Sequence, residues 1–136
     1  MAFPAPPPKK DPMFPIPADA PTPPDHPNMG RPLLRWPYKN ALGQTIFYVC
    51  RFEPTPNKKI PLPLAYYETG WEYELRLEFY PLFGLEQLKI NPARDVLLVE
   101  GEKACLAARV IFPDMVVMCW HGGTGRVDSA DLTPLK

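Results

Sequence analysis

Two candidate chemical groups, an acid and a glycine-containing turn, each follow an apolar run near the C-terminus. Glu100 comes directly after Val96 to Val99, an unbroken apolar run that is typical of a strand buried on both faces. The turn from His121 to Gly123 comes directly after a second apolar run, Met115 to Trp120. Ligands of open α/β sheets bind beyond the carboxyl ends of the strands. We therefore expect Glu100 and this turn to face one crevice, where a carboxylate and an imidazole would be available for acid or base chemistry.

Each of these groups also has a plain structural interpretation. An acid placed directly after a buried strand is costly unless it is exposed or paired, so Glu100 is either a functional group or a paired structural one. Gly122 and Gly123, with the two residues that follow them, either present amide groups to a phosphate or form only a tight turn. His121 is either an acid/base group or a turn residue. The residue patterns leave these alternatives open.

The residues between the two apolar runs predict a helix, which makes the segment a βαβ unit. From Glu102 onwards, small and apolar residues recur at the spacing i, i+3, i+4 and i+7, and this face would lie close on a sheet. Pro113 ends the helix. Glu102 and Lys103 open it and are expected to be solvated first-turn residues, with Glu102 at the positive end of the helix dipole. The face predicted to be buried consists of Ala104, Ala107, Ala108 and Ile111.

Short apolar runs divided by turn residues predict an antiparallel β-meander from Leu33 to Phe79. The strand from Thr45 to Glu53 has apolar residues on both faces and should be central. The next strand, Lys58 to Tyr67, carries Pro61 and Pro63. Proline donates no backbone hydrogen bond, so this strand should lie at an edge.

The last predicted strand of the meander has the clearest period in the chain. Large apolar side chains alternate with charged ones from Trp71 to Phe79, so one face should pack and the other should be wet. Its aromatic residues either form a stacking platform for bases or belong to the core, and the three acids on the opposite face favour the core. A short helix, Gly84 to Ile90, leads on to the βαβ unit. The buried set of the meander is predicted to include Phe47, Val49, Trp71, Tyr73 and Leu75.

The first part of the chain is rich in proline. Thirteen of the 21 prolines precede Tyr38, and proline fixes φ and removes a hydrogen-bond donor. We expect residues 1–32 to be a disordered tail, which is either a linker or, through Pro4 to Lys9, a docking ligand. The chain is thus divided into a tail at 1–32, an antiparallel β region with a short helix at 33–92 and an α/β unit at 93–136.

Composition restricts the partners and the compartment. Fifteen basic and fifteen acidic residues give a formal net charge of zero, so strong autonomous binding to the phosphates of DNA is not expected. No apolar run reaches membrane-spanning length and the N-terminus has no signal-peptide pattern, so we expect a cytoplasmic protein. The three cysteines have no Cys-x-x-Cys spacing and are expected to be buried, reduced thiols rather than metal or redox groups: Cys50, Cys105 and Cys119.

The sequence around Glu100 resembles a known family. Val-Glu-Gly-Glu-Lys at Val99 to Lys103, the alanine-rich helix and the apolar run ending in two glycines resemble the first half of a Toprim domain, the fold shared by bacterial primases and topoisomerases. Tyr80 to Leu88 and Phe47 to Phe52 are similar to the region that precedes this domain in primase-like proteins of phages and mobile elements. The resemblance implies that Glu100 is the family's glutamate, an acid/base or metal-linked residue. The candidate phosphate or nucleotide contacts are Gly101, Lys103, His121, Gly122 and Gly123.

The resemblance also implies a fold and a function. The fold would be α+β, an antiparallel β-meander followed by a partial Toprim-like βαβ unit with an incomplete parallel sheet. The family's Asp-x-Asp strand for divalent metal should follow Leu132 to Lys136, where the given sequence ends. We therefore expect a fragment of a Toprim-type DNA primase-like protein of a mobile element, which performs metal-dependent nucleotidyl transfer in DNA replication.

Cofactor and partners follow from the same resemblance. Mg²⁺ would occupy the complete family site but would not be held stably by this chain, which should be inactive alone. The expected partners are nucleic acid, nucleotides and the missing C-terminal region or a replication protein, with no membrane. The alternative is a non-catalytic binding or accessory module, in which the proline-rich tail and the β-meander serve an assembly and the βαβ unit is only scaffolding.

Overall fold

The chain has an α+β fold that combines an antiparallel and a parallel sheet. The structure is a computed structural model and describes residues 11–122 and 125–136. The antiparallel sheet has the order β1-β2-β3-β4 and the parallel sheet the order β5-β6. The strands are β1 (Leu34–Lys39), β2 (Thr45–Thr55), β3 (Lys58–Tyr67), β4 (Gly70–Glu72), β5 (Val96–Val99) and β6 (Val116–Cys119). Helical segments in the described residues are α1 (Leu85–Ile90), α2 (Glu102–Ile111) and the 3-10 turns Val127–Ser129 and Thr133–Leu135.

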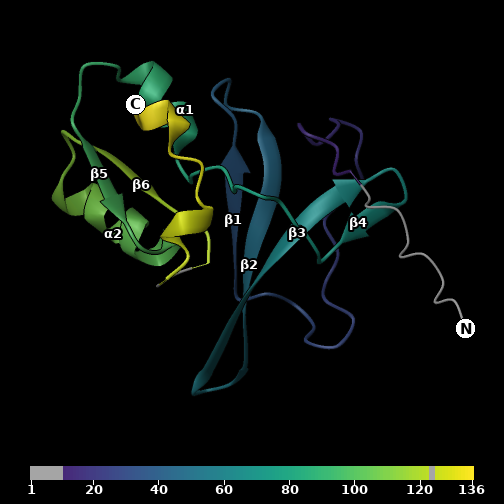
Figure 1. Cartoon of the computed structure of the whole chain (residues 1–136). Helices are drawn as coiled ribbons and strands as arrows, with labels where there is room; N and C mark the ends of the chain where they lie inside the picture. The colour runs from purple at the N-terminus through teal and green to yellow at the C-terminus, as the bar shows by residue number, and fades with distance from the viewer. Residues whose placement is uncertain (1–10, 123–124) are drawn as a thin grey trace, which may run out of the picture.

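The antiparallel sheet lies between two layers (Figure 1). The βαβ unit of β5, α2 and β6 lies against one face, and most of residues 11–32, called the N-terminal strap below, lies against the other, while Phe14 of the strap stacks on Phe47. The core on the βαβ side includes Phe47 and Val49 from β2 together with Cys105 and Val117 from the βαβ unit. Each face of the sheet is therefore covered, which is why the sheet can be apolar on both sides.

Strand β2 is central, as its sequence predicts. It pairs with β1 on one side and with β3 on the other. Phe47 and Val49 face the βαβ unit, while Cys50 and Phe52 face the N-terminal strap, and each of the four is at most 1% exposed. The apolar residues on both faces of this strand thus belong to two separate cores.

Strand β3 is an edge over the half that carries its prolines. Pro61 and Pro63 pair only with β2, opposite Arg51 and Val49. Strand β4 pairs only with the last three residues of β3, beginning at Ala65. A proline nitrogen directed away from β2 leaves no unmet donor where no neighbouring strand is present. The prediction of an edge strand is therefore confirmed for the half of β3 that carries the prolines. It is wrong for the end of β3 from Ala65 to Tyr67, which lies between β2 and β4.

The strand predicted from Trp71 to Phe79 is wrong in its length. Strand β4 ends at Glu72, after which the chain leaves the sheet and reaches Tyr80, which forms a parallel bridge with Ala130. Leu75 is buried, but Trp71 and Tyr73 are only half-buried, and Phe79 is 54% exposed. The alternation does separate the buried Leu75 from exposed charged neighbours, but strand pairing stops because the chain turns toward the βαβ unit.

The βαβ unit forms as predicted, but its strands are unequally buried. Strands β5 and β6 pair in parallel from Val96 and Val116 to Val99 and Cys119, and α2 connects them. All four residues of β6 are buried, whereas all four of β5 are half-buried. The expectation that β5 is buried on both faces is therefore wrong, because β6 is its only strand neighbour among the described residues.

Helix α2 packs with a face that shares only Ala108 with the predicted one, and Ala108 is half-buried against the core. Its only buried residue is Cys105, and Ala104 and Ala107 are exposed, as is Ile111 at 69%. Cys105 and Arg109, four residues apart, both donate to a carbonyl of β6. Polar contacts of these two side chains, rather than the small size of alanine, set the orientation of the helix.

The N-terminal strap is packed on the sheet, so the prediction of a free, disordered tail does not describe residues 11–32. The amide of Met13 donates to the carbonyl of Tyr66, and the amide of Ile16 donates to that of Thr45. The strap nevertheless contains no regular helix or strand, as its prolines require. Its order comes from contacts with side chains of the sheet, which the proline pattern could not reveal. Residues 1–10, with the predicted docking ligand at Pro4 to Lys9, lie outside the described part of the chain.

Within the described ranges, none of the helices has the length and apolar character that crossing a lipid bilayer requires.

Candidate functional site

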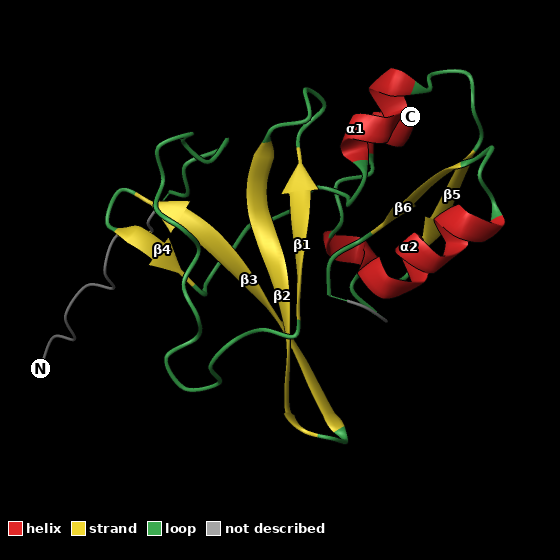
Figure 2. Cartoon of the chain, turned by 180° about the vertical axis from the view of Figure 1, so that it is seen from behind, coloured by secondary structure: helices red, strands yellow, loops and turns green. Residues whose placement is uncertain are grey.

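The carboxyl ends of β5 and β6 lie side by side and carry the predicted site residues. Parallel pairing ends at Val99 opposite Cys119, so Glu100 and the residues from Trp120 onward leave the sheet at the same end. Helix α2 begins there with Gly101 as its N-cap. Figure 2 shows the two strands side by side, with α2 running alongside them. The two segments thus leave the sheet at one end, and the crevice that they were expected to face stays a prediction.

Glu100, Gly101 and Lys103 form the accessible part of this end. The side chains of Glu100 and Lys103 are exposed. Gly101 has an extended backbone, with φ at −148°, and an added Cβ would meet no atom within 4 Å. Neither backbone conformation nor packing thus requires glycine at this position. The backbone at Gly101, next to Glu100, is therefore open to solvent on the side where a Cβ would lie.

His121 belongs to the aromatic core rather than to this open surface. Its ring centroid lies 4.9 Å from that of Tyr80, 6.3 Å from that of Tyr38 and 6.5 Å from that of Phe47. Burial, with a smaller contribution from the positive charge of Arg126, lowers the pKa of His121, so the ring is neutral at pH 7. Its Nδ1 atom is buried and has no hydrogen-bond partner among the described residues. A neutral, packed imidazole fits the structural interpretation of His121 better than an acid/base role beside Glu100.

Gly122 is required by the turn that it forms. Its φ of +95° lies in the left-handed region, and an added Cβ would lie 2.9 Å from Cγ of Arg126. This geometry supports the tight-turn interpretation of Gly122. Gly123 and Thr124, which complete the predicted phosphate loop, lie outside the described residues.

A hydrogen bond that sequence reasoning missed joins the two halves of the fold beside the site. The hydroxyl of Tyr38 on β1 donates to Oε1 of Glu102 at the start of α2, over 2.7 Å. Burial, followed by the negative charge of Glu102, raises the pKa of Tyr38 well above its usual range. Glu102 is half-buried, so the prediction of a solvated residue is wrong. The bond spans 64 positions, and neither residue lies in a pattern that indicates the other.

A carbonyl of β6 collects three donors from α2. Sγ of Cys105 lies 3.3 Å from the carbonyl oxygen of Val117, and Nε and Nη2 of Arg109 lie 3.3 and 3.2 Å from the same oxygen. The guanidinium also lies over the ring of Phe83, 5.2 Å from its centroid. These contacts anchor α2 to the sheet.

The cysteines are buried thiols, as predicted. None of the surface of Cys50, Cys105 or Cys119 is exposed, and no disulfide joins them. A thiol–thiol hydrogen bond lowers the pKa of Cys105 and raises that of Cys119, and burial adds to the second shift. Both thiols lie in the same core cluster.

The described residues do not by themselves complete a metal centre. No group of three or more His, Cys, Asp or Glu side chains within residues 11–122 and 125–136 is arranged to hold a metal ion. Glu100 thus contributes a carboxylate at an exposed strand end, but it is not part of a group of three such side chains in this part of the chain.

Comparisons with known protein families, with curated proteins and with solved structures found no match.

Proposed function

We propose that this chain is the N-terminal part of a Toprim-type primase-like protein of a phage or mobile element, which performs metal-dependent nucleotidyl transfer in DNA replication. One observation carries the proposal. Glu100 follows β5 directly, is exposed, and lies at the end of the parallel sheet where α2 begins. That is the placement which the resemblance implies for the family's glutamate. Such a protein would act in the cytoplasm.

The roles assigned to the residues follow from their positions. The Glu100 carboxylate would accept a proton or hold a metal-bound water. Lys103, exposed in the first turn of α2, would offer a positive charge to the phosphates of a nucleotide, and Gly101 leaves space for their approach. His121 and Gly122 would shape the neighbouring turn rather than contact the nucleotide.

The fit to Mg²⁺ is incomplete in this chain. Mg²⁺ in proteins is usually held by one or two carboxylates, substrate phosphates and water in near-octahedral geometry. Glu100 is the carboxylate that the described strand ends supply, and one exposed carboxylate by itself holds the ion only weakly. The proposal requires further carboxylates, and the resemblance assigns them to an Asp-x-Asp strand after Lys136.

Two experiments test the proposal. The first determines the DNA sequence downstream of the Lys136 codon and asks whether it encodes an apolar segment followed by Asp-x-Asp. If no reading frame encodes this motif, the proposal is contradicted. The second titrates MnCl₂ into the ¹⁵N-labelled chain and follows paramagnetic broadening of the backbone amides.

Broadening should begin near Glu100 and Gly101 at millimolar Mn²⁺, and Glu100→Gln should abolish it. Glu53→Gln is the matched control, because Glu53 is an exposed acid on β2 in the antiparallel sheet. If Glu53→Gln changes the broadening as much as Glu100→Gln does, the metal binds exposed acids without preference and Glu100 is not a site.

A further inference from the structure

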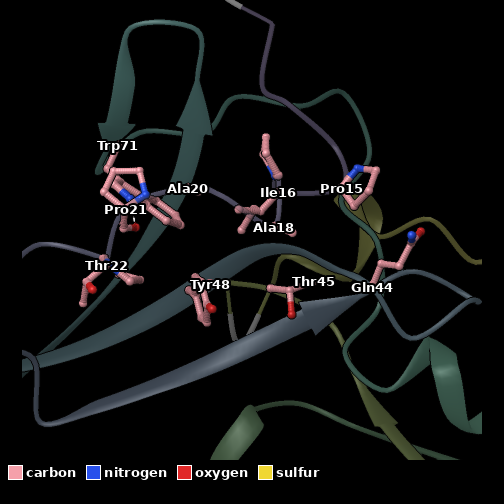
Figure 3. A pocket seen from close by; sticks show the side chains of 12 residues that line it. Pro15, Ile16, Ala18, Ala20, Pro21, Thr22, Gln44, Thr45, Tyr48 and Trp71 are labelled. Atoms are coloured by element: carbon pink, nitrogen blue, oxygen red, sulfur yellow. Dashed lines mark hydrogen bonds between the residues drawn. The ribbon is translucent and has the colours of Figure 1, made fainter.

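The N-terminal strap crosses the sheet on a row of aromatic hydrogen-bond donors. Nε1 of Trp71 donates to the carbonyl of Pro21 over 2.8 Å, and the hydroxyl of Tyr73 donates to the carbonyl of Pro24 over 2.5 Å. Figure 3 shows the Trp71 indole directly beside Pro21, with Tyr48 on the neighbouring part of the surface. Tyr48, Trp71 and Tyr73 together are called the aromatic groove below.

The spacing of these bonds matches the geometry of a polyproline helix. The two carbonyl acceptors are three residues apart in Ala-Pro-Thr-Pro-Pro-Asp, Ala20 to Asp25. A polyproline II helix has three residues per turn, so carbonyls at i and i+3 point to the same side, about 9 Å apart. The donors come from β4, at Trp71, and from the bend that follows it, at Tyr73. Two donors of the sheet side thus meet two acceptors of the strap.

Two further contacts hold the strap beside Tyr73, a hydrogen bond from Arg35 and a ring contact of His26. Nη2 of Arg35 donates to the Pro24 carbonyl over 3.2 Å, so this oxygen accepts two bonds. The ring of His26, next along the strap, lies 5.0 Å from that of Tyr73. Aromatic rings that pack on prolines while their polar ends bind carbonyl oxygens are the general means by which proteins recognise proline-rich peptides.

The strap occupies the groove without closing it. Pro21, Thr22 and Pro24 are exposed, and Trp71 and Tyr73 are only half-buried beneath them. A cavity of about 570 Å³ remains open between the strap and the sheet, lined by residues that include Thr45, Tyr48 and Trp71. The stretch from Pro21 to Pro24 is mostly exposed, whereas His26 packs on Phe52 and Met29 belongs to the core on this side of the sheet. Exchange of Pro21 to Pro24 alone therefore exposes less apolar surface than removal of the whole strap would.

We propose that the aromatic groove is a receptor for a proline-rich segment of a partner protein, and that Pro21 to Pro24 occupies it as an intramolecular competitor. The hydrogen bonds go to backbone carbonyls, which any segment of this kind carries. The partner segment would contain a Pro-x-Pro-Pro run, and the charge of Arg35 at the end of the groove would favour an acid after it, as Asp25 follows Pro24. The proposal is independent of the chemistry assigned to Glu100.

Tethering determines how binding by a partner is observed. A tethered segment competes at an effective concentration in the millimolar range, so a free peptide should bind the unmodified chain weakly. Replacing Pro21 and Pro24 by glycine in the full chain removes the preformed polyproline geometry of the competitor while the groove keeps its donors. The double variant should therefore bind the peptide more tightly than the unmodified chain does.

The experiment measures fluorescence anisotropy of a labelled peptide that copies residues 17–27, titrated with full-length chains. The Pro21→Gly, Pro24→Gly chain should bind it at least about tenfold more tightly than the unmodified chain. Adding Tyr73→Phe, which keeps the ring and removes the hydroxyl, should weaken binding about fivefold to tenfold. Adding Tyr66→Phe, the matched control on β3, should change it less than twofold, because Tyr66 makes a ring contact with Trp71 but lies outside the groove's donor row.

Several results would overturn the proposal. One is that the labelled peptide does not bind the Pro21→Gly, Pro24→Gly chain at millimolar concentration. Another is that Tyr73→Phe and Tyr66→Phe weaken peptide binding equally. A dimer of the unmodified chain that exchanges its straps, seen by light scattering, would identify a second copy as the occupant and would also overturn it. One measurement needs no variant and follows the backbone amide resonance of Thr22, in the strap of the unmodified chain. This resonance should shift as the unlabelled peptide displaces the strap at millimolar concentration, and an unmoved resonance would contradict the groove's role.

Discussion

The hydrogen bond between Tyr38 and Glu102 should make a measurable contribution to stability, and Tyr38→Phe isolates it. The substitution keeps the ring, which stacks on Phe47 at 4.6 Å between centroids, and removes only the hydroxyl. A hydrogen bond to a charged group contributes about 1.5–3 kcal/mol. Glu102 is half-buried and regains water when the donor is lost, so the lower end applies. We expect a loss of about 1.5 kcal/mol at pH 7, or about 5 °C in Tm for a domain of this size.

The cost of Tyr38→Phe should depend on pH in a defined direction. Burial and the charge of Glu102 raise the pKa of Tyr38 above its usual value near 10. Below that pH the phenol is protonated in both states, and the stabilisation is fully present. Above it the unfolded chain ionises first, so the folded state binds more protons and stability falls by up to about 1.4 kcal/mol per pH unit. The variant has no phenol at this position and does not lose this stability. The difference in free energy of unfolding between the unmodified chain and the variant should therefore become smaller from about pH 10 upward.

Urea denaturation of both proteins between pH 7 and pH 11 measures this effect. Tyr66→Phe is the control, and its free energy of unfolding should stay within about 0.5 kcal/mol of the unmodified chain. In a Glu102→Ala background, Tyr38→Phe should cost about 1 kcal/mol less than in the unmodified chain. A cost that is the same in both backgrounds, or that does not change up to pH 11, would refute the assignment of a buried phenol bonded to this carboxylate.

Three further predictions concern the proposed site and the core. The 136-residue chain should synthesise no primer with Mg²⁺, because Glu100 alone offers too few oxygen ligands. Primer made by the unmodified chain but not by Glu100→Gln would show that the active site is complete and that this prediction is wrong. Leu75→Ala should cost about 2–4 kcal/mol and Phe79→Ala under about 1, since Leu75 is 4% and Phe79 54% exposed; equal losses in urea denaturation would contradict this packing. The buried thiols of Cys50, Cys105 and Cys119 should resist a thiol-specific disulfide reagent in the native chain and react fully in urea. A rapid reaction of the native chain would disprove their burial.

The local patterns of the sequence determined most of the strands and helices and their order, although the predicted strand from Trp71 to Phe79 ends at Glu72. The apolar residues on both faces of β2 required two layers of cover, and the two prolines of β3 kept β4 from pairing with the half of β3 that carries them. The apolar runs around α2 required a βαβ unit with Glu100 at its carboxyl end. Each of these conclusions depends on residues close together in the chain, where periodicity and proline chemistry act directly.

The tertiary structure alone decided which faces meet. In α2, the predicted face began at Ala104, whereas the packed side chains are those of Cys105 and Arg109, with the same helical spacing. Helical periodicity predicts that residues with this spacing share a face, but it does not predict which face packs on the sheet. Here the packed face is the one whose side chains donate hydrogen bonds to the Val117 carbonyl.

The same reason explains the N-terminal strap. Its prolines determined that it would form neither helix nor strand, because they fix φ and remove donors. Their carbonyls remained available as acceptors, and donors for them came from Trp71 and Tyr73, about fifty positions away. Internal hydrogen bonds of the strap are confined to short turns such as His26 to Gly30. The strap therefore takes most of its order from the surface on which it lies, and that surface exists only after the sheet has folded.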